Sequence, residues 1–73
     1  MWDSGYTRFF MWEVKHYDLC SAYGINNGRI SKLHIVDLKT KETVCSYDRG
    51  WDIKPEENTL AYKLMQDLID TFN

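Results

Sequence analysis

The sequence predicts an α+β fold: an antiparallel meander sheet of three to four strands, with one C-terminal amphipathic helix packed on one face. Three observations predict it. Apolar and polar residues alternate through the first two thirds of the chain, Asn and Gly separate the alternating segments, and apolar residues recur every three or four positions after Pro55. Because the strands come first and the helix last, a sheet covered by one helix is the simplest arrangement.

Three segments have the alternation of strands: residues 7–17, 29–38 and 43–51. The first places Phe10, Trp12, Val14 and His16 on one face. The third places Cys45, Tyr47, Arg49 and Trp51 on one face. Residues 1–6 are rich in turn formers, and we expect them to form a loosely held arm. The 24–28 segment, Gly-Ile-Asn-Asn-Gly, predicts a tight turn, because Asn and Gly tolerate positive φ.

The helix is predicted to begin near Pro55, which suits a first helical turn, and Glu56 and Glu57 would complement its positive dipole end. Asn58 is an alternative N-cap. The apolar stripe of this helix consists of Leu60, Ala61, Leu64, Met65, Leu68, Ile69 and Phe72. Tyr62 falls on the polar side, where we expect an exposed contact.

The length and net charge of the chain exclude some classes of function. Seventy-three residues make one small domain, and a net charge of −2 argues against general nucleic-acid binding. No segment has the length and apolarity of a membrane span or the pattern of a signal peptide, so we expect a cytoplasmic protein. Cys20 and Cys45 are expected as free thiols there, with a disulfide as the alternative. An open sheet face carrying Trp12 or Trp51 would favour a homo-oligomer.

Residues 47–52, Tyr-Asp-Arg-Gly-Trp-Asp, concentrate the side chains that dominate recognition surfaces. Arg binds phosphate through two hydrogen bonds, and aromatic rings stack on bases. The candidate ligand-binding residues are Arg29, Lys32, Tyr47, Asp48, Arg49 and Trp51. The alternative is structural: Arg49 pairs with a neighbouring Asp and Trp51 anchors the core. No glycine-rich phosphate loop is present, so an anion site would depend on side chains.

Metal and catalytic chemistry have weaker support. His16, Cys20, His34 and Cys45 are zinc-ligating types, but their spacing matches no zinc knuckle. Cys20 with His16 is the one local nucleophile–base pair, and His16 lies in the middle of a predicted strand. We therefore expect no enzymatic activity, no metal and no cofactor.

Two motifs carry a family resemblance: residues 24–33 (GINNGRISKL) and residues 47–52 (YDRGWD) followed by Pro55. Over about residues 23–73 the chain resembles small uncharacterised proteins of Gram-positive bacteria and of their phages or mobile elements. The resemblance implies no enzyme activity. It suggests an accessory protein that inhibits or sequesters a host defence component. Its ligand would be a small nucleotide-like anion, or, alternatively, a host protein docked on an aromatic sheet face.

Overall fold

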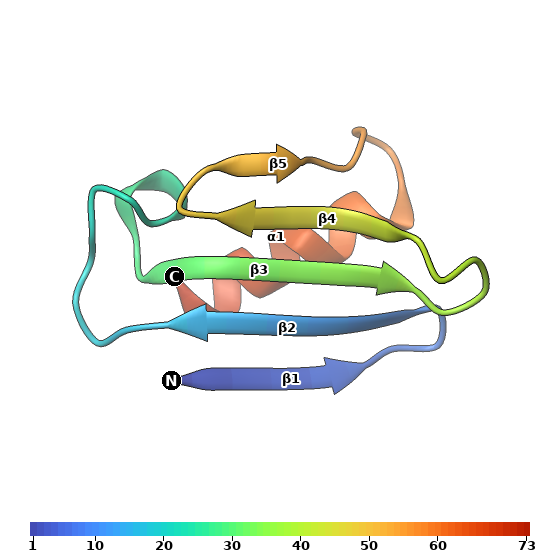
Figure 1. Ribbon diagram of the computed structural model, residues 1–73, viewed down its shortest axis with the longest axis horizontal. Coiled ribbons are helices and arrows are strands. Elements are labelled where there is room, and N and C mark those ends of the chain that lie inside the picture. The colour runs from blue at the N-terminus through green and yellow to red at the C-terminus, as the bar shows by residue number, and fades with distance from the viewer.

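The computed structural model describes all residues 1–73 and has the predicted α+β fold. Five antiparallel strands follow one another in the order β1-β2-β3-β4-β5, and one helix crosses a single face of the sheet (Figure 1). The sheet thus has five strands where three to four were expected. The elements are β1 (Trp2–Tyr6), β2 (Phe10–His16), the 3₁₀ turn η1 (Ile25–Asn27), β3 (Ile30–Asp37), β4 (Thr43–Asp48), β5 (Trp51–Ile53) and α1 (Leu60–Phe72).

The first additional strand is β1, where a loosely held arm was expected. It pairs with β2 along its whole length, from Trp2 opposite Lys15 to Tyr6 opposite Met11. A side-chain hydrogen bond also holds it against β2, because Asp3 Oδ2 lies 2.7 Å from His16 Nε2. The Trp12 indole lies over Gly5, where an added Cβ would come within 2.7 Å of the ring. Strand pairing therefore outweighs the turn propensity of these residues.

The second additional strand arises because the predicted 43–51 strand divides. β4 ends at Asp48, Arg49 turns the chain at a φ of 58°, and β5 returns with Trp51 opposite Tyr47. The turn removes Arg49 from the alternation that would have placed it beside Tyr47 and Trp51. The prediction that these three side chains share one face is therefore wrong for Arg49.

The helix begins later than predicted. Thr59 is the N-cap, and its hydroxyl accepts a hydrogen bond from the Tyr62 N–H at 3.1 Å. Pro55, Glu56 and Glu57 lie in the connection before α1 rather than in its first turn. Tyr62 is half-buried against the core, so it is not the exposed contact expected from its place on the polar side. At 13 residues, α1 is too short to cross a membrane, and the chain contains no other α-helix.

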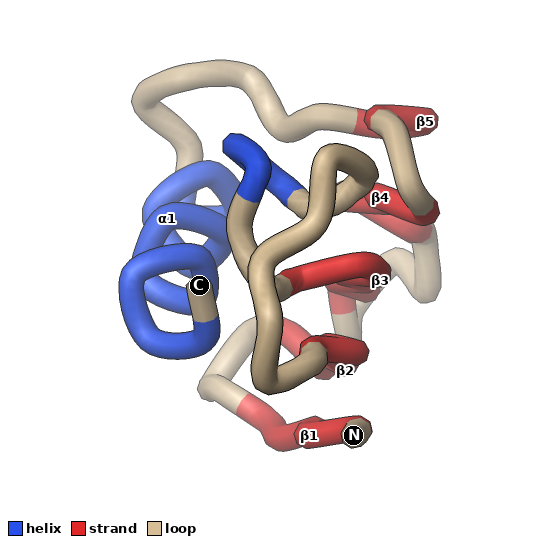
Figure 2. The backbone as a smooth tube through the Cα atoms, turned by 90° about the vertical axis from the view of Figure 1, so that its left-hand side faces the viewer, coloured by secondary structure: helices blue, strands red, loops and turns tan.

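The core lies between α1 and the middle strands (Figure 2). It comprises Phe10, Val14, Ile25, Ile30, Leu33, Ile35, Cys45, Tyr47, Ala61, Met65, Leu68 and Ile69. Trp12 also faces the helix, with its ring centroid 5.8 Å from that of Phe72. The open face therefore does not carry Trp12. Among strand residues, its exposed aromatic side chains are those of Trp2 and Tyr6, on the edge strand.

The 24–28 segment belongs to a longer connection between β2 and β3 and does not form a tight hairpin. Asn26 and Asn27 have positive φ, as predicted for their type, but neither glycine does. Gly24 is required by space, since an added Cβ would lie 2.2 Å from the Gly28 carbonyl oxygen. The Asn73 side chain then ties the connection to the end of α1, because its amide donates to the Ile25 carbonyl at 2.8 Å.

Candidate functional site

A basic pocket lies at one end of the sheet, where β2 ends, β3 begins and β4 turns into β5 (Figure 1). The connection between β2 and β3 forms one wall and the β4–β5 turn forms another. Its volume is about 240 Å³, and it is lined by Lys15, Tyr17, Ser21, Tyr23, Ser31, Lys32 and Arg49.

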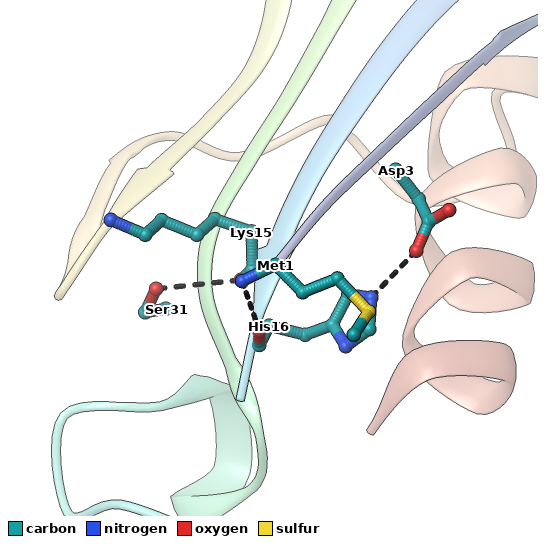
Figure 3. A network of polar contacts seen from close by, with 5 residues as sticks. All are labelled: Met1, Asp3, Lys15, His16 and Ser31. Atoms are coloured by element: carbon teal, nitrogen blue, oxygen red, sulfur yellow. Dashed lines mark hydrogen bonds and ion pairs between the residues drawn. The ribbon is translucent and has the colours of Figure 1, made fainter. Parts of the chain in front are cut away.

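Strand register brings the two lysines together. Lys15 on β2 lies directly opposite Lys32 on β3, so both side chains leave the same face of the sheet. Figure 3 shows Lys15 extending away from the side on which His16 and Asp3 meet. A β-bulge inserts Ser31 between the partners of Lys15 and His16, and its hydroxyl donates to the Lys15 carbonyl oxygen at 3.4 Å. The bulge thus lets the consecutive residues Ser31 and Lys32 line one pocket.

Arg49 enters the pocket from a strained backbone position. Its φ of 58° is left-handed, which costs a non-glycine residue about 1–2 kcal/mol. The backbone N–H of Arg49 donates to the Ser31 carbonyl oxygen at 3.0 Å, which fixes the turn against the start of β3. Strain of this kind persists where the surrounding structure over-determines it, and it is commonly associated with binding sites. Asn26, Asn27 and Asn58 also have positive φ, but Asn tolerates it, which leaves Arg49 and Lys41 as the costly cases.

The side chains that line the pocket carry a net positive charge. Three of the seven lining residues are cations and none is a carboxylate, although the whole chain has a net charge of −2. The nearest paired acid is Asp48, whose Oδ2 lies 3.8 Å from Lys32 Nζ at the surface. The neighbouring Lys15 side chain lowers the pKa of the Tyr17 hydroxyl below its ordinary value. Ser31 and the charge of Arg49 lower the pKa further, and desolvation opposes the change.

This combination of groups suits a phosphate. A guanidinium and two ammonium groups supply charge-assisted hydrogen bonds, and the hydroxyl of Ser21 adds a neutral donor. Tyr17 and Tyr23 offer aromatic surface beside the cations. Pockets for whole drug-sized ligands usually measure about 300–1,000 Å³. The smaller volume here fits one anionic group with part of the molecule that carries it.

The structure brings some of the predicted site residues together and separates others. Lys32 and Arg49 line the pocket, and Asp48 lies at its margin through its ion pair with Lys32. Tyr47 and Trp51 lie on the helix side of the sheet, where their rings meet edge to face with centroids 5.0 Å apart. Arg29 is exposed outside the pocket.

Tyr47 still reaches the pocket wall indirectly. Its hydroxyl donates to the Tyr23 carbonyl oxygen at 2.6 Å, which joins the core to the connection between β2 and β3. Burial raises the pKa of Tyr47, so this donor stays protonated at neutral pH. Trp51 does not anchor the core as the structural alternative required, because it is 37% exposed and lies outside the core cluster. Its ring contacts Tyr47, and Lys54 Nζ lies 5.3 Å from its centroid.

Sequence reasoning missed five lining residues: Lys15, Tyr17, Ser21, Tyr23 and Ser31. The alternation of the first predicted strand does place Lys15 and Tyr17 on one face, and that was the available signal. Ser21, Tyr23 and Ser31 depend on the path of a long connection and on a bulge. Neither leaves a periodic trace in the sequence.

The His and Cys residues occupy separate environments, with no group of three potential metal ligands. His16 pairs with Asp3, and His34 Nε2 lies 3.0 Å from the Ser46 hydroxyl. Cys20 is exposed and Cys45 is buried, and both are free thiols. Burial raises the pKa of Cys45 to about 12, which makes it an unreactive core residue.

The other hollows lack this convergence of like charges. The largest, about 690 Å³, runs along the exposed side of α1 and mixes Glu57 and Asp67 with Lys63. A second, about 430 Å³, lies between the start of α1 and the sheet and is lined by Asp37 and Glu56 beside apolar groups. Only the pocket at the β4–β5 turn combines several cations with no lining acid.

Fold and pocket together define a small α+β protein with a basic pocket at one end of an open sheet. The chain belongs to the family described as a domain of unknown function, DUF7678, whose model matches residues 1–73. No curated protein and no solved structure matches the chain.

Proposed function

We propose that this protein is a non-catalytic binding protein that holds a small phosphate-bearing ligand of the nucleotide class. The observation that carries the proposal is the convergence of Lys15, Lys32 and Arg49 on one pocket without a lining carboxylate. Tyr17 and Tyr23 provide rings on which a base or sugar can pack beyond the phosphate. The pocket offers no His, Asp, Glu or Cys as a base or activated nucleophile, which favours binding over turnover.

In this proposal the protein acts by sequestration. The resemblance of its GINNGRISKL and YDRGWD segments to proteins of phages and mobile elements motivates an accessory role against a host defence component. Its two free thiols favour a reducing compartment, and we propose the cytoplasm. The motifs also contribute to the pocket directly, since the first contains Ser31 and Lys32 and the second contains Arg49.

Calorimetric titration tests the proposal, with inorganic phosphate and adenosine monophosphate as probes at low ionic strength. We expect the nucleotide to bind more tightly than phosphate, and added salt to weaken both, because the contacts are ionic. Arg49→Ala should reduce affinity at least about tenfold, since a charge-assisted hydrogen bond contributes about 1.5–3 kcal/mol. Lys54→Ala is the matched control, because Lys54 is an exposed cation outside the pocket.

Two results would contradict the proposal: no binding of either probe at millimolar concentration, or equal loss of affinity in Arg49→Ala and Lys54→Ala. The alternative function is docking of a host protein on the open sheet face, which exposes Trp2 and Tyr6. In that case Arg49→Ala would leave the affinity for the target unchanged, and substitutions at those two aromatics would abolish it.

A further inference from the structure

The outer edge of β1 is a free pairing surface. β1 pairs with β2 on one side only, and nothing lies beyond its other edge (Figures 1 and 2). β5, at the opposite edge of the sheet, is three residues long, and short edge strands resist further pairing. β1 has five residues and contains no proline, lysine or arginine, and its one charged side chain, Asp3, is held by His16 of β2 instead of extending over the free edge.

The hydrogen-bond pattern identifies which backbone groups are free. Met1 and His16 exchange N–H···O bonds at one end of the pair, and the Thr7 N–H donates to the Phe10 carbonyl at the other. Bonded and non-bonded pairs alternate along an antiparallel ladder. The odd-numbered residues of β1 therefore bond to β2, while the N–H and C=O groups of Trp2, Ser4 and Tyr6 point outward.

From this geometry we infer that β1 pairs with β1 of a second copy of the chain, forming a symmetric dimer with one continuous sheet. In the antiparallel register centred on Ser4, Trp2 lies opposite Tyr6 of the second copy, and Ser4 lies opposite its own equivalent. Every outward-pointing group of the strand then has a partner. Each of the three pairs exchanges two hydrogen bonds, about six in all.

The side chains also complement one another in this register. Trp2 and Tyr6 lie on the open face and are 53% and 75% exposed, so each interface would bring an exposed indole against an exposed phenol twice. On the helix side, Asp3 lies opposite Gly5 of the second copy. The carboxylate meets no acid there, and its own partner remains His16 (Figure 3).

Charges next to the edge support a second copy as the occupant. Lys15 Nζ lies 5.8 Å from the centroid of the Trp2 ring, which places a cation against the aromatic pair of the interface. No paired position sets like charges against each other. Because the two-fold axis passes through Ser4, the contact closes on itself and leaves the β5 strands of the two copies as the remaining edges.

Sedimentation equilibrium over a range of concentrations tests the dimer, using the wild-type chain, Ser4→Pro and Ser4→Ala. The wild type should approach twice the chain mass as concentration rises. Ser4→Pro removes an outward N–H that β2 does not use, so it should keep the fold and remain a monomer. Ser4→Ala keeps the N–H and should associate like the wild type. Circular dichroism verifies that each variant is folded.

A cysteine cross-link tests the register even if Ser4→Pro does not fold. In a Cys20→Ser background, Ser4→Cys should form a covalent dimer on oxidation, because bonded antiparallel pairs place Cα atoms about 5.5 Å apart, within disulfide range. Thr43→Cys, an exposed position on β4, is the control and should not cross-link. In both variants Cys45 remains buried.

Three outcomes would overturn the inference. The wild type could remain a monomer at all concentrations. It could dimerise without responding to Ser4→Pro and without cross-linking at Ser4→Cys. It could also grow into larger species, which would indicate pairing of β1 with β5 of the next copy. Arg49→Ala should leave the dimer intact, so this result and the phosphate titration test separate claims.

Discussion

The two faces of the sheet are made from the same strands but differ in what their side chains contribute. On the helix-covered face, Val14, Leu33 and Ile35 are fully buried, and apolar contact with α1 stabilises the fold. On the open face, Lys15, Lys32 and Arg49 leave the same strands or their ends and gather around a pocket. Because these side chains are at least partly exposed, we expect them to contribute little to folding. The comparison indicates that one face stabilises the protein, and the other is the face on which we propose that a ligand binds.

The most direct way to separate the faces is to change two adjacent residues of β3. Leu33→Ala removes a fully buried side chain and should lower the free energy of unfolding by about 2–5 kcal/mol. Lys32→Ala, one residue away on the open face, should change it by no more than about 0.5 kcal/mol. Urea denaturation measures both. Equal destabilisation by the two substitutions would contradict the difference between the helix-covered face and the open face.

The hydroxyl of Tyr47 connects the two faces. Tyr47→Phe leaves the Tyr23 carbonyl without its 2.6 Å donor and should cost about 1–3 kcal/mol of stability. Because that carbonyl lies in the pocket wall, affinity for adenosine monophosphate should also fall. Thermal denaturation and calorimetry on the same variant measure the two effects. Tyr62→Phe is a control on the helix, and it should leave the affinity unchanged. If nucleotide affinity survives Tyr47→Phe intact, the pocket wall does not depend on the core.

Much of the helix-covered face was predictable, because burial imposes periodicity. The alternation from Phe10 to His16 and the helical stripe from Ala61 to Ile69 both follow from contact with one core. β1 was not predictable from local propensity, since pairing with β2 rather than composition makes Trp2–Tyr6 a strand. The open face was predicted only in part. Lys32 and Arg49 were identified by their chemistry, but alternation placed Arg49 beside Tyr47.

The wrong placement of Arg49 by the predicted alternation has a specific cause. A single left-handed residue at Arg49 reverses the chain, and the bulge at Ser31 shifts its neighbours. Each is one backbone event that interrupts the period of two on which strand predictions depend. In this protein, both irregularities occur at the pocket. A further register shift, between Ile35 and Val36 of β3, lies away from the pocket.

Relieving the strain at Arg49 should separate stability from binding. Arg49→Gly removes a left-handed penalty of about 1–2 kcal/mol and adds a glycine entropy cost of about 0.4–1 kcal/mol. The free energy of unfolding should therefore be unchanged or rise by up to about 1.6 kcal/mol, while nucleotide affinity is lost. Lys41→Gly is the matched control, with a φ of 65° in a turn outside the pocket. It should gain similar stability and keep the affinity. Denaturation measures the stability of both variants, and titration with nucleotide measures their affinity.

The thiols offer a smaller, pH-dependent contrast between the core and the surface. Cys20 should react with iodoacetamide in the native protein, and Cys45 only after unfolding, which mass spectrometry can count. The folded-state pKa of Cys45, about 12, lies above its ordinary value of 9.0. Its contribution to stability should therefore be complete below pH 9 and decline as pH rises toward 12. Cys45→Ala should remove the loss of stability that deprotonation of Cys45 causes at high pH. Rapid native labelling of Cys45 would contradict its placement in the core.

The central claim is that the basic pocket of the open face binds a phosphate-bearing ligand. It is tested most directly by titrating isotope-labelled protein with adenosine monophosphate and following backbone amide resonances by NMR. We predict saturable shifts centred on Lys15, Ser31, Lys32 and Arg49, with the amides of α1 unmoved and the shifts absent in Arg49→Gly. Shifts centred on α1, or no saturable shifts at millimolar nucleotide, would contradict the claim.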